Sequence, residues 1–131
     1  MIVVDSSALV AILRREPAAD RFLQVIAKAD TCLLSALSLL ETSMVLAGRR
    51  GDGTAWAGLD ALIARAGMEV VAQDAGQARL ARQAFLDFGK GRHPAALNLG
   101  DCATYALARS RGMPLLFKGD DFTQTDLVPA A

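Results

Sequence analysis

Short apolar runs alternate along this chain with longer stretches of helical periodicity, and this alternation limits the folds open to it. Strands are expected at residues 2–4, 31–34, 68–71 and 115–117, with a weak fifth strand at 126–128. Helices are expected at 8–13, from about 17 to 26, from 35 or 38 to 49, and at 54–65, 74–88 and 98–110. Strands joined by helical crossovers form a mainly parallel sheet with helices on both faces. The sequence therefore predicts a single α/β domain over residues 1–131, with a mainly parallel sheet of four to five strands.

Local signals mark the helix ends. Ser6 or Ser7 is expected to cap the first helix, and Asp74 and Asn98 the last two. Pro17 suits an early position of the second helix. Glycines at 51 and 53 are expected to end the third helix, whose start is ambiguous between Ser35 and Ser38.

Four acids occupy positions that border this predicted core. Asp5 and Asp120 follow strands, whereas Glu41 and Asp101 interrupt apolar helical patterns. Carboxylates rarely stand there uncompensated. Because parallel strands deliver their ends to one rim, we expect these acids to converge there around a divalent cation that offsets their mutual repulsion.

Each acid also has a purely structural interpretation. Asp5 suits a turn or cap, and Glu41 completes a capping box if its helix starts at Ser38. Asp101 lies in a first helical turn, where the helix dipole favours a negative charge. Adjacent side chains point in different directions, so one of Asp120 and Asp121 is expected to face the site, with Asp120 favoured.

The predicted ligands are all oxygen atoms, a set that suits Mg²⁺, with Mn²⁺ as a substitute. No histidine base or activated serine or cysteine nucleophile is evident in the pattern, so the metal is expected to activate the attacking water. The two cysteines, at positions 32 and 102, have no partner at a metal-ligand spacing. The chemistry expected of such a site is hydrolysis of phosphodiester bonds.

The overall charge balance hides an asymmetry. The chain has 14 basic and 14 acidic residues, so with four acids assigned to the pocket 10 remain against 14 bases. Basic groups near predicted helix ends can meet phosphates or complement helix dipoles: Arg14-Arg15, Arg49-Arg50, Lys90-Arg92 and Arg109-Arg111. Lys118 also has two interpretations, as a phosphate contact or as an ordinary surface residue.

No apolar run is long enough to span a bilayer, and the start lacks the basic region of a signal peptide, so a cytoplasmic location without membrane partners is expected.

Four segments together resemble the PIN domain of the VapC-type toxins, the ribonuclease halves of bacterial type II toxin–antitoxin pairs. They are VVDSSALVAIL (3–13), LSLLETSMVL (37–46), LNLGDCATYALA (97–108) and PLLFKGDDFTQTDL (114–127). By this resemblance Asp5, Glu41 and Asp101 match the family's acids, and the fourth acid falls on Asp120 or Asp121. Ser7 matches a hydroxyl position that supports the first acid, and Asn98 a polar position beside the site.

The resemblance also implies what such a protein does. It implies a Mg²⁺-dependent endoribonuclease that cuts RNA, leaves a 5′-phosphate and inhibits translation and growth. It further implies a VapB-like antitoxin that neutralises the enzyme, and a homodimer that buries apolar helix faces such as those bearing Met44 or Trp56.

Two other classes of function remain open from the sequence. A receiver domain also gathers acids and a lysine around Mg²⁺, although this chain lacks an adjacent acidic pair after its first strand. A PIN-like module that has lost catalysis and only binds partners is the other alternative, and the presence of all four acids counts against it.

Overall fold

The computed structural model describes residues 1–49 and 51–131. Four parallel strands form one sheet in the order β3-β2-β1-β4. The strands are β1 (Ile2–Val4), β2 (Cys32–Ser35), β3 (Glu69–Val71) and β4 (Leu115–Leu116). This architecture confirms the predicted α/β class with a parallel sheet.

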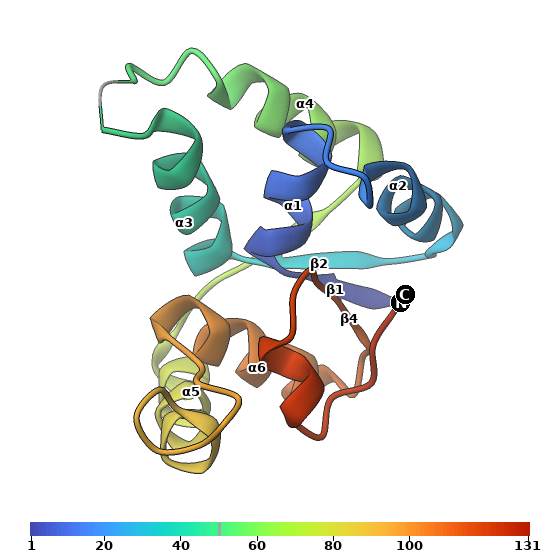
Figure 1. Cartoon of the computed structure of the whole chain (residues 1–131). Coiled ribbons are helices and arrows are strands. Elements are labelled where there is room, and N and C mark those ends of the chain that lie inside the picture. The colour runs from blue at the N-terminus through green and yellow to red at the C-terminus, as the bar shows by residue number, and fades with distance from the viewer. Residues whose placement is uncertain (50) are drawn as a thin grey trace.

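Helices cover both faces of the sheet (Figure 1). One face carries α1 (Ser6–Leu13), α2 (Ala19–Lys28), α3 (Ala36–Ala47) and α4 (Trp56–Ala66). The other carries α5 (Ala75–Phe88) and α6 (Leu99–Arg111), and a short 3-10 helix η1 (Asp121–Gln124) follows β4. No helix in the described part of the chain is long and apolar enough to cross a membrane.

Successive strand residues enter two different cores. In β1, Val4 packs into the cluster beneath α1, α2 and α4, whereas Val3 packs into the cluster beneath α5 and α6. In β2, Leu34 packs into the first of these clusters and Leu33 into the second. Because side chains alternate across a pleated strand, a sheet buried on both faces needs a continuous apolar run. This is why the two central strands, β1 and β2, are almost continuously apolar in the sequence.

Several helix ends differ from expectation. Asp5 caps α1, because its side chain accepts the Ser7 N–H; the expected caps Ser6 and Ser7 are themselves helical. Pro17 precedes α2 and lies outside it. Ser35 caps α3, which excludes a capping box between Ser38 and Glu41.

The end of α3 also differs, since the helix stops at Gly48, whose positive φ of 63° favours glycine, and not at Gly51 or Gly53. Arg50, one of the predicted basic residues, lies outside the described residues. Asp74 and Asn98 cap α5 and α6 as predicted.

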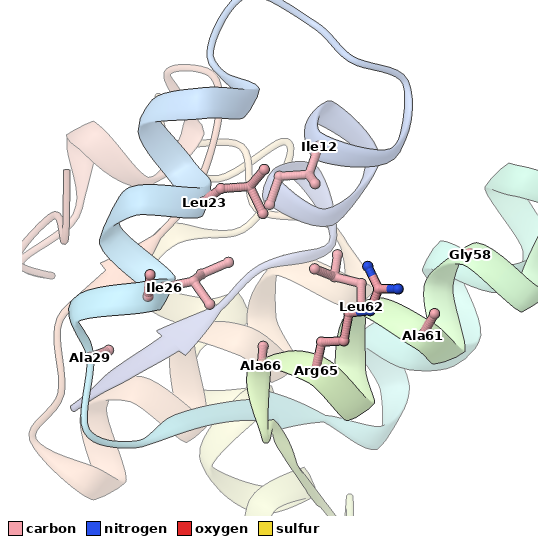
Figure 2. A pocket seen from close by; sticks show the side chains of 10 residues that line it. Ile12, Leu23, Ile26, Ala29, Gly58, Ala61, Leu62, Arg65 and Ala66 are labelled. Carbon is pink, nitrogen blue, oxygen red and sulfur yellow. The ribbon is translucent and has the colours of Figure 1, made fainter.

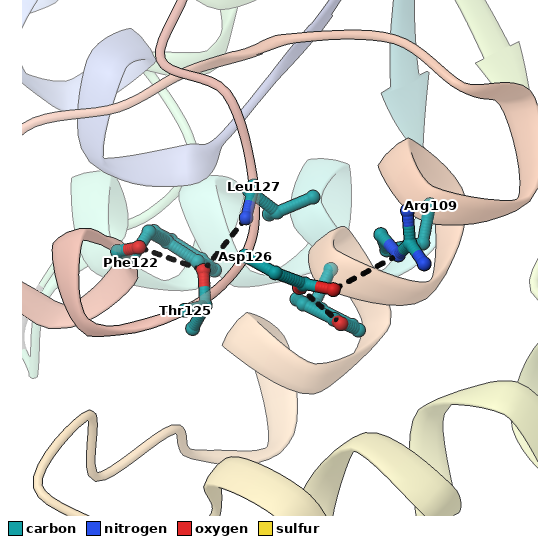
Figure 3. A network of polar contacts seen from close by, with 6 residues as sticks. Arg109, Phe122, Thr125, Asp126 and Leu127 are labelled. Carbon is teal, nitrogen blue, oxygen red and sulfur yellow. Dashed lines mark hydrogen bonds and ion pairs between the residues drawn. The ribbon is translucent and has the colours of Figure 1, made fainter.

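The expected fifth strand at 126–128 does not form. The segment follows β4 closely, with the Leu115 N–H donating to Val128 O and the Ala130 N–H donating to Leu115 O. The pairing is limited to one isolated bridge, between Leu115 and Pro129, which is too little to form a strand. Asp126 fastens this segment to α6 by accepting from the Tyr105 hydroxyl at 2.6 Å and by pairing with Arg109 at 3.5 Å (Figure 3).

Candidate active site

Three acids far apart in the sequence line one cleft of about 490 Å³. Asp5 leaves the carboxyl end of β1, Glu41 projects from α3, and Asp101 lies in the first turn of α6. The parallel sheet causes this convergence, because β1 and β2 end at the same rim and α1 and α3 start there.

Asp5 is the most deeply buried of the three, with 2% of its surface exposed. Its Oδ2 accepts the Ser7 N–H at 3.0 Å and the Ser7 hydroxyl at 2.6 Å. The Ser7 hydroxyl in turn accepts the Lys118 N–H at 2.9 Å, which ties the segment after β4 to the first acid. The other oxygen, Oδ1, is buried and has no hydrogen-bond partner among the described residues.

Glu41 is held by contacts that the sequence did not reveal. The Ser6 hydroxyl donates to Glu41 Oε1 at 2.6 Å, across 35 residues of chain. The carboxylate lies directly against the backbone of Gly100, where an added Cβ would come within 2.4 Å of Oε2. Gly100 therefore permits α3 and α6 to bring their acids together.

Asp101 combines its structural and functional interpretations. It forms a reciprocal capping box with Asn98: the Asn98 N–H donates to Asp101 Oδ2 at 3.1 Å, and the Asp101 N–H donates to Asn98 Oδ1 at 2.9 Å. The side chain nevertheless lines the cleft. Capping fixes the orientation of this carboxylate without removing it from the site.

A buried pair of hydroxyl groups joins the two helices behind the acids. Ser38 and Thr104 are fully buried, and their oxygen atoms lie 3.0 Å apart. Ser38 precedes Glu41 by three residues and Thr104 follows Asp101 by three, so each shares a helix face with an acid. Neither residue was predicted to belong to the site, and its spacing of one helical turn from an acid is the sequence signal that marks it.

Burial raises the pKa values of Asp5 and Asp101, and neighbouring negative charges add to the rise. For Asp5, the hydrogen bonds from Ser7 and the proximity of the Thr104 hydroxyl oppose the rise in pKa, and the charge of Glu41 adds to it. The pKa of Asp101 is raised to about 7 by burial and, to a smaller extent, by the charges of Asp5, Asp121 and Glu41, against the opposing hydrogen bond from the Asn98 backbone. A nearby cation would relieve this accumulation of negative charge.

The fourth acid is less closely placed. Asp120 and Asp121 are both exposed and neither lines the cleft. Asp121 contributes to the raised pKa of Asp101, whereas Asp120 does not. The charge of Asp121 is therefore felt at the site, while the full ligand set of five residues, and the choice between Asp120 and Asp121, stay predictions.

The donor set fits a hard divalent cation. The acidic lining offers only oxygen ligands, and the buried Asp5 Oδ1 lacks any other partner. No group of three or more acid, histidine or cysteine side chains in the described chain is arranged to hold a metal ion. Mg²⁺ does not need such a group, because it commonly binds through one or two carboxylates and keeps several waters.

A larger hollow of about 590 Å³ lies elsewhere, between α2 and α4 and beside Ile12 (Figure 2). Leu23 and Ile26 line it from α2, and Leu62 and Arg65 from α4. Its lining has no carboxylate, histidine or cysteine, so this hollow lacks the groups that hydrolysis needs.

Comparison with known proteins identifies the family. The model of the PIN domain family matches residues 2–127. A relative from Mycobacterium tuberculosis strain H37Rv, "Ribonuclease VapC30", is 46% identical over 130 residues, which cover 99% of this chain and 98% of the relative.

Solved structures show the same fold. The crystal structure of Mycobacterium tuberculosis VapC20, described as a sarcin-ricin loop cleaving toxin, superposes with a TM-score of 0.78 at 22% identity, covering 98% of this chain and 97% of the other. A toxin-antitoxin complex from Klebsiella pneumoniae gives 0.71 at 15% identity, covering 100% and 98%.

The chain therefore belongs to the PIN domain family, and within it to the VapC group. This confirms the resemblance found in the sequence and the predicted fold, and it excludes the receiver-domain alternative.

Proposed function

We propose that this protein is a Mg²⁺-dependent endoribonuclease and the toxin of a type II toxin–antitoxin pair. The observation that carries the proposal is the convergence of Asp5, Glu41 and Asp101, from three separate segments, on one cleft. The names of the VapC relatives as ribonucleases support RNA as the substrate.

Asp5, Glu41 and Asp101 would hold the ion, with Asp121 or Asp120 as an outer acid. A divalent cation bound there supplies an activated water and neutralises charge on the phosphate oxygens, and Mn²⁺ can replace Mg²⁺. The cleft lining contains no histidine and no cysteine. The protein's part in the chemistry is therefore to hold the three carboxylates in one fixed arrangement.

Each acid has a dedicated support for this task. Ser7 orients Asp5, Ser6 orients Glu41, and the capping box with Asn98 orients Asp101. Holding reacting groups in a fixed geometry is worth several kcal/mol of barrier lowering. These hydrogen bonds explain how an open cleft can present three carboxylates in a defined arrangement.

The biological setting belongs to the same proposal. We place the protein in the cytoplasm with RNA, where its activity inhibits translation until a VapB-like antitoxin neutralises it. A guanidinium group from such a partner would compensate the clustered acids as a cation does. We also propose a homodimer, because α3 presents apolar side chains to solvent, among them Met44, which is 64% exposed.

The decisive experiment is RNA cleavage by the purified protein, freed of any partner, with Mg²⁺ and then with EDTA. We expect cleavage with the metal, none with the chelator, and products that carry a 5′-phosphate. Asp5→Asn and Asp101→Asn should each abolish cleavage and also relieve the toxicity of expression.

The inactive-module alternative gives the opposite results. It predicts no cleavage by the wild type and no heat of binding when millimolar Mg²⁺ is titrated into the protein. Undiminished cleavage by both Asn variants would instead show that the active site lies elsewhere.

A further inference from the structure

The mouth of the acidic cleft carries two cations that the catalytic proposal does not use. Arg14, just after α1, and Lys118, just after β4, both line the cleft. Glu16 lies between them in the same lining and forms an ion pair with the Lys118 ammonium group. No ion-pair partner of Arg14 occurs in the described residues.

RNA cannot approach three carboxylates without some compensation for its phosphates. A metal held by the acids would neutralise the phosphate that is cut, and the phosphates on either side of it would then lie near the mouth of the cleft. Cations at that mouth are placed to contact them. Among the described residues, Arg14 and Lys118 are the cations that line this cleft.

Lys118 is fixed at its backbone, whereas its side chain is open to solvent. Its N–H donates to Ser7, which itself donates to Asp5, so the main chain is tied to the first acid. Its side chain is 45% exposed and that of Glu16 is 29% exposed. An ion pair this open to solvent is weak, so a phosphate can take the place of Glu16.

We propose that Arg14 and Lys118 bind phosphates of the RNA that flank the cleaved bond, and that Glu16 competes with RNA for Lys118. The inference rests on the proposed ribonuclease function and adds to it. Lys118 and Arg14 are then substrate-positioning residues, and Glu16 is a built-in restraint that weakens RNA binding.

The two members of the ion pair should have opposite effects, which a structural role cannot produce. If the ion pair only stabilises the fold, Lys118→Met and Glu16→Gln both remove it and change the Kd for RNA in the same direction. If Glu16 competes with RNA, Lys118→Met weakens RNA binding and Glu16→Gln strengthens it.

The test measures binding of a fluorescein-labelled single-stranded RNA of mixed sequence by anisotropy, with Mg²⁺, in the full-length Asp101→Asn background. We expect Lys118→Met to raise Kd about 5-fold and Glu16→Gln to lower it about 2-fold, as for exposed ion pairs. Lys118→Met should also reduce the slope of log Kd against log salt by about 0.7, the value of one phosphate contact on a single strand.

Two controls make the result specific. Lys28→Met removes an exposed cation from the last turn of α2, which leads into the amino end of β2, whereas the cleft lies at the carboxyl ends of the strands. This variant should change neither Kd nor the salt slope. The double variant Glu16→Gln/Lys118→Met should bind like Lys118→Met alone, because Glu16 acts through Lys118.

In the cleaving protein, Lys118→Met should raise KM about 5-fold and leave kcat within 2-fold, since the contact is away from the reacting atoms. The inference is overturned if both single variants shift Kd in the same direction, or if Lys118→Met keeps the wild-type salt slope. A wild-type protein that never cleaves RNA with Mg²⁺ would instead refute the proposed function, so the two failures are distinguishable.

Discussion

Gly100 offers the sharpest test of the site, because a single methyl group there should separate activity from stability. A Cβ built on Gly100 would lie 2.4 Å from Glu41 Oε2 and 2.6 Å from Oε1. Real Cβ atoms do not approach other atoms within 3.0 Å, so the carboxylate in Gly100→Ala must retreat by at least the 0.6 Å difference from 2.4 Å.

The displacement of the Glu41 carboxylate should cost little folding free energy but lower the rate of RNA cleavage strongly. Glu41 moves at the far end of a flexible side chain, and alanine is up to ~1 kcal/mol better than glycine within a helix. Misplacing a group by about 1 Å at a reacting centre costs about 100-fold in rate. We therefore expect Gly100→Ala to keep or exceed the wild-type unfolding midpoint while RNA cleavage falls about 100-fold.

Gly76→Ala is the matched control. Gly76 is also the second residue of its helix after an Asp or Asn cap, and its added Cβ would meet its nearest neighbour, Asp74 Oδ1, at an ordinary 3.4 Å. It should gain similar stability without losing activity. Full activity in Gly100→Ala would refute the close packing of α3 and α6 on Glu41, and so would a matching loss in Gly76→Ala.

Three further predictions concern the surroundings of the acids. The pKa of Asp101 rises from 3.8 to about 7 on folding, so the folded protein binds more protons in that range. In EDTA, the unfolding temperature should therefore fall as pH rises from about 4 to about 7, and less so in Asp101→Asn. Thr104→Val strands the buried Ser38 hydroxyl and should cost about 1–3 kcal/mol in urea unfolding. Tyr105→Phe removes an exposed hydrogen bond to Asp126 and should cost at most about 1 kcal/mol, with cleavage unchanged.

Each of these has a clear contrary outcome. A pH dependence that is equally steep in Asp101→Asn would assign the proton uptake to another group. A Thr104→Val protein as stable as the wild type would mean that Ser38 finds another partner. Lost cleavage in Tyr105→Phe would give the C-terminal segment a role in catalysis that its position does not indicate.

The sequence predicted the layers of the fold well, because a sheet buried on both faces leaves a distinct pattern of short apolar runs. It also located the acids, since Asp5 and Asp101 stand where an apolar pattern breaks. It could not choose among neighbouring caps: Asp5, Ser6 and Ser7 are all good N-caps, and only the end of β1 decides which one precedes the helix.

Other features depend on contacts between distant parts of the chain. The bond from Ser6 to Glu41 spans 35 residues, and no local pattern encodes it. The choice between Asp120 and Asp121 depends on the turn at Gly119, whose φ of +100° sets the direction of the chain after β4. The expected fifth strand depends on such contacts too, because its segment meets β4 at a single bridge, between Leu115 and Pro129.

The two borders of the sheet restrict how this molecule can associate with others. At one border residues 128–130 already occupy the backbone groups of Leu115, and at the other β3 is only three residues long and begins with the exposed Glu69. Neither edge of the sheet offers a template for addition of a strand from a partner protein, nor for edge-to-edge aggregation. Recognition of another macromolecule is thereby left to the helical faces and to the loops around the cleft.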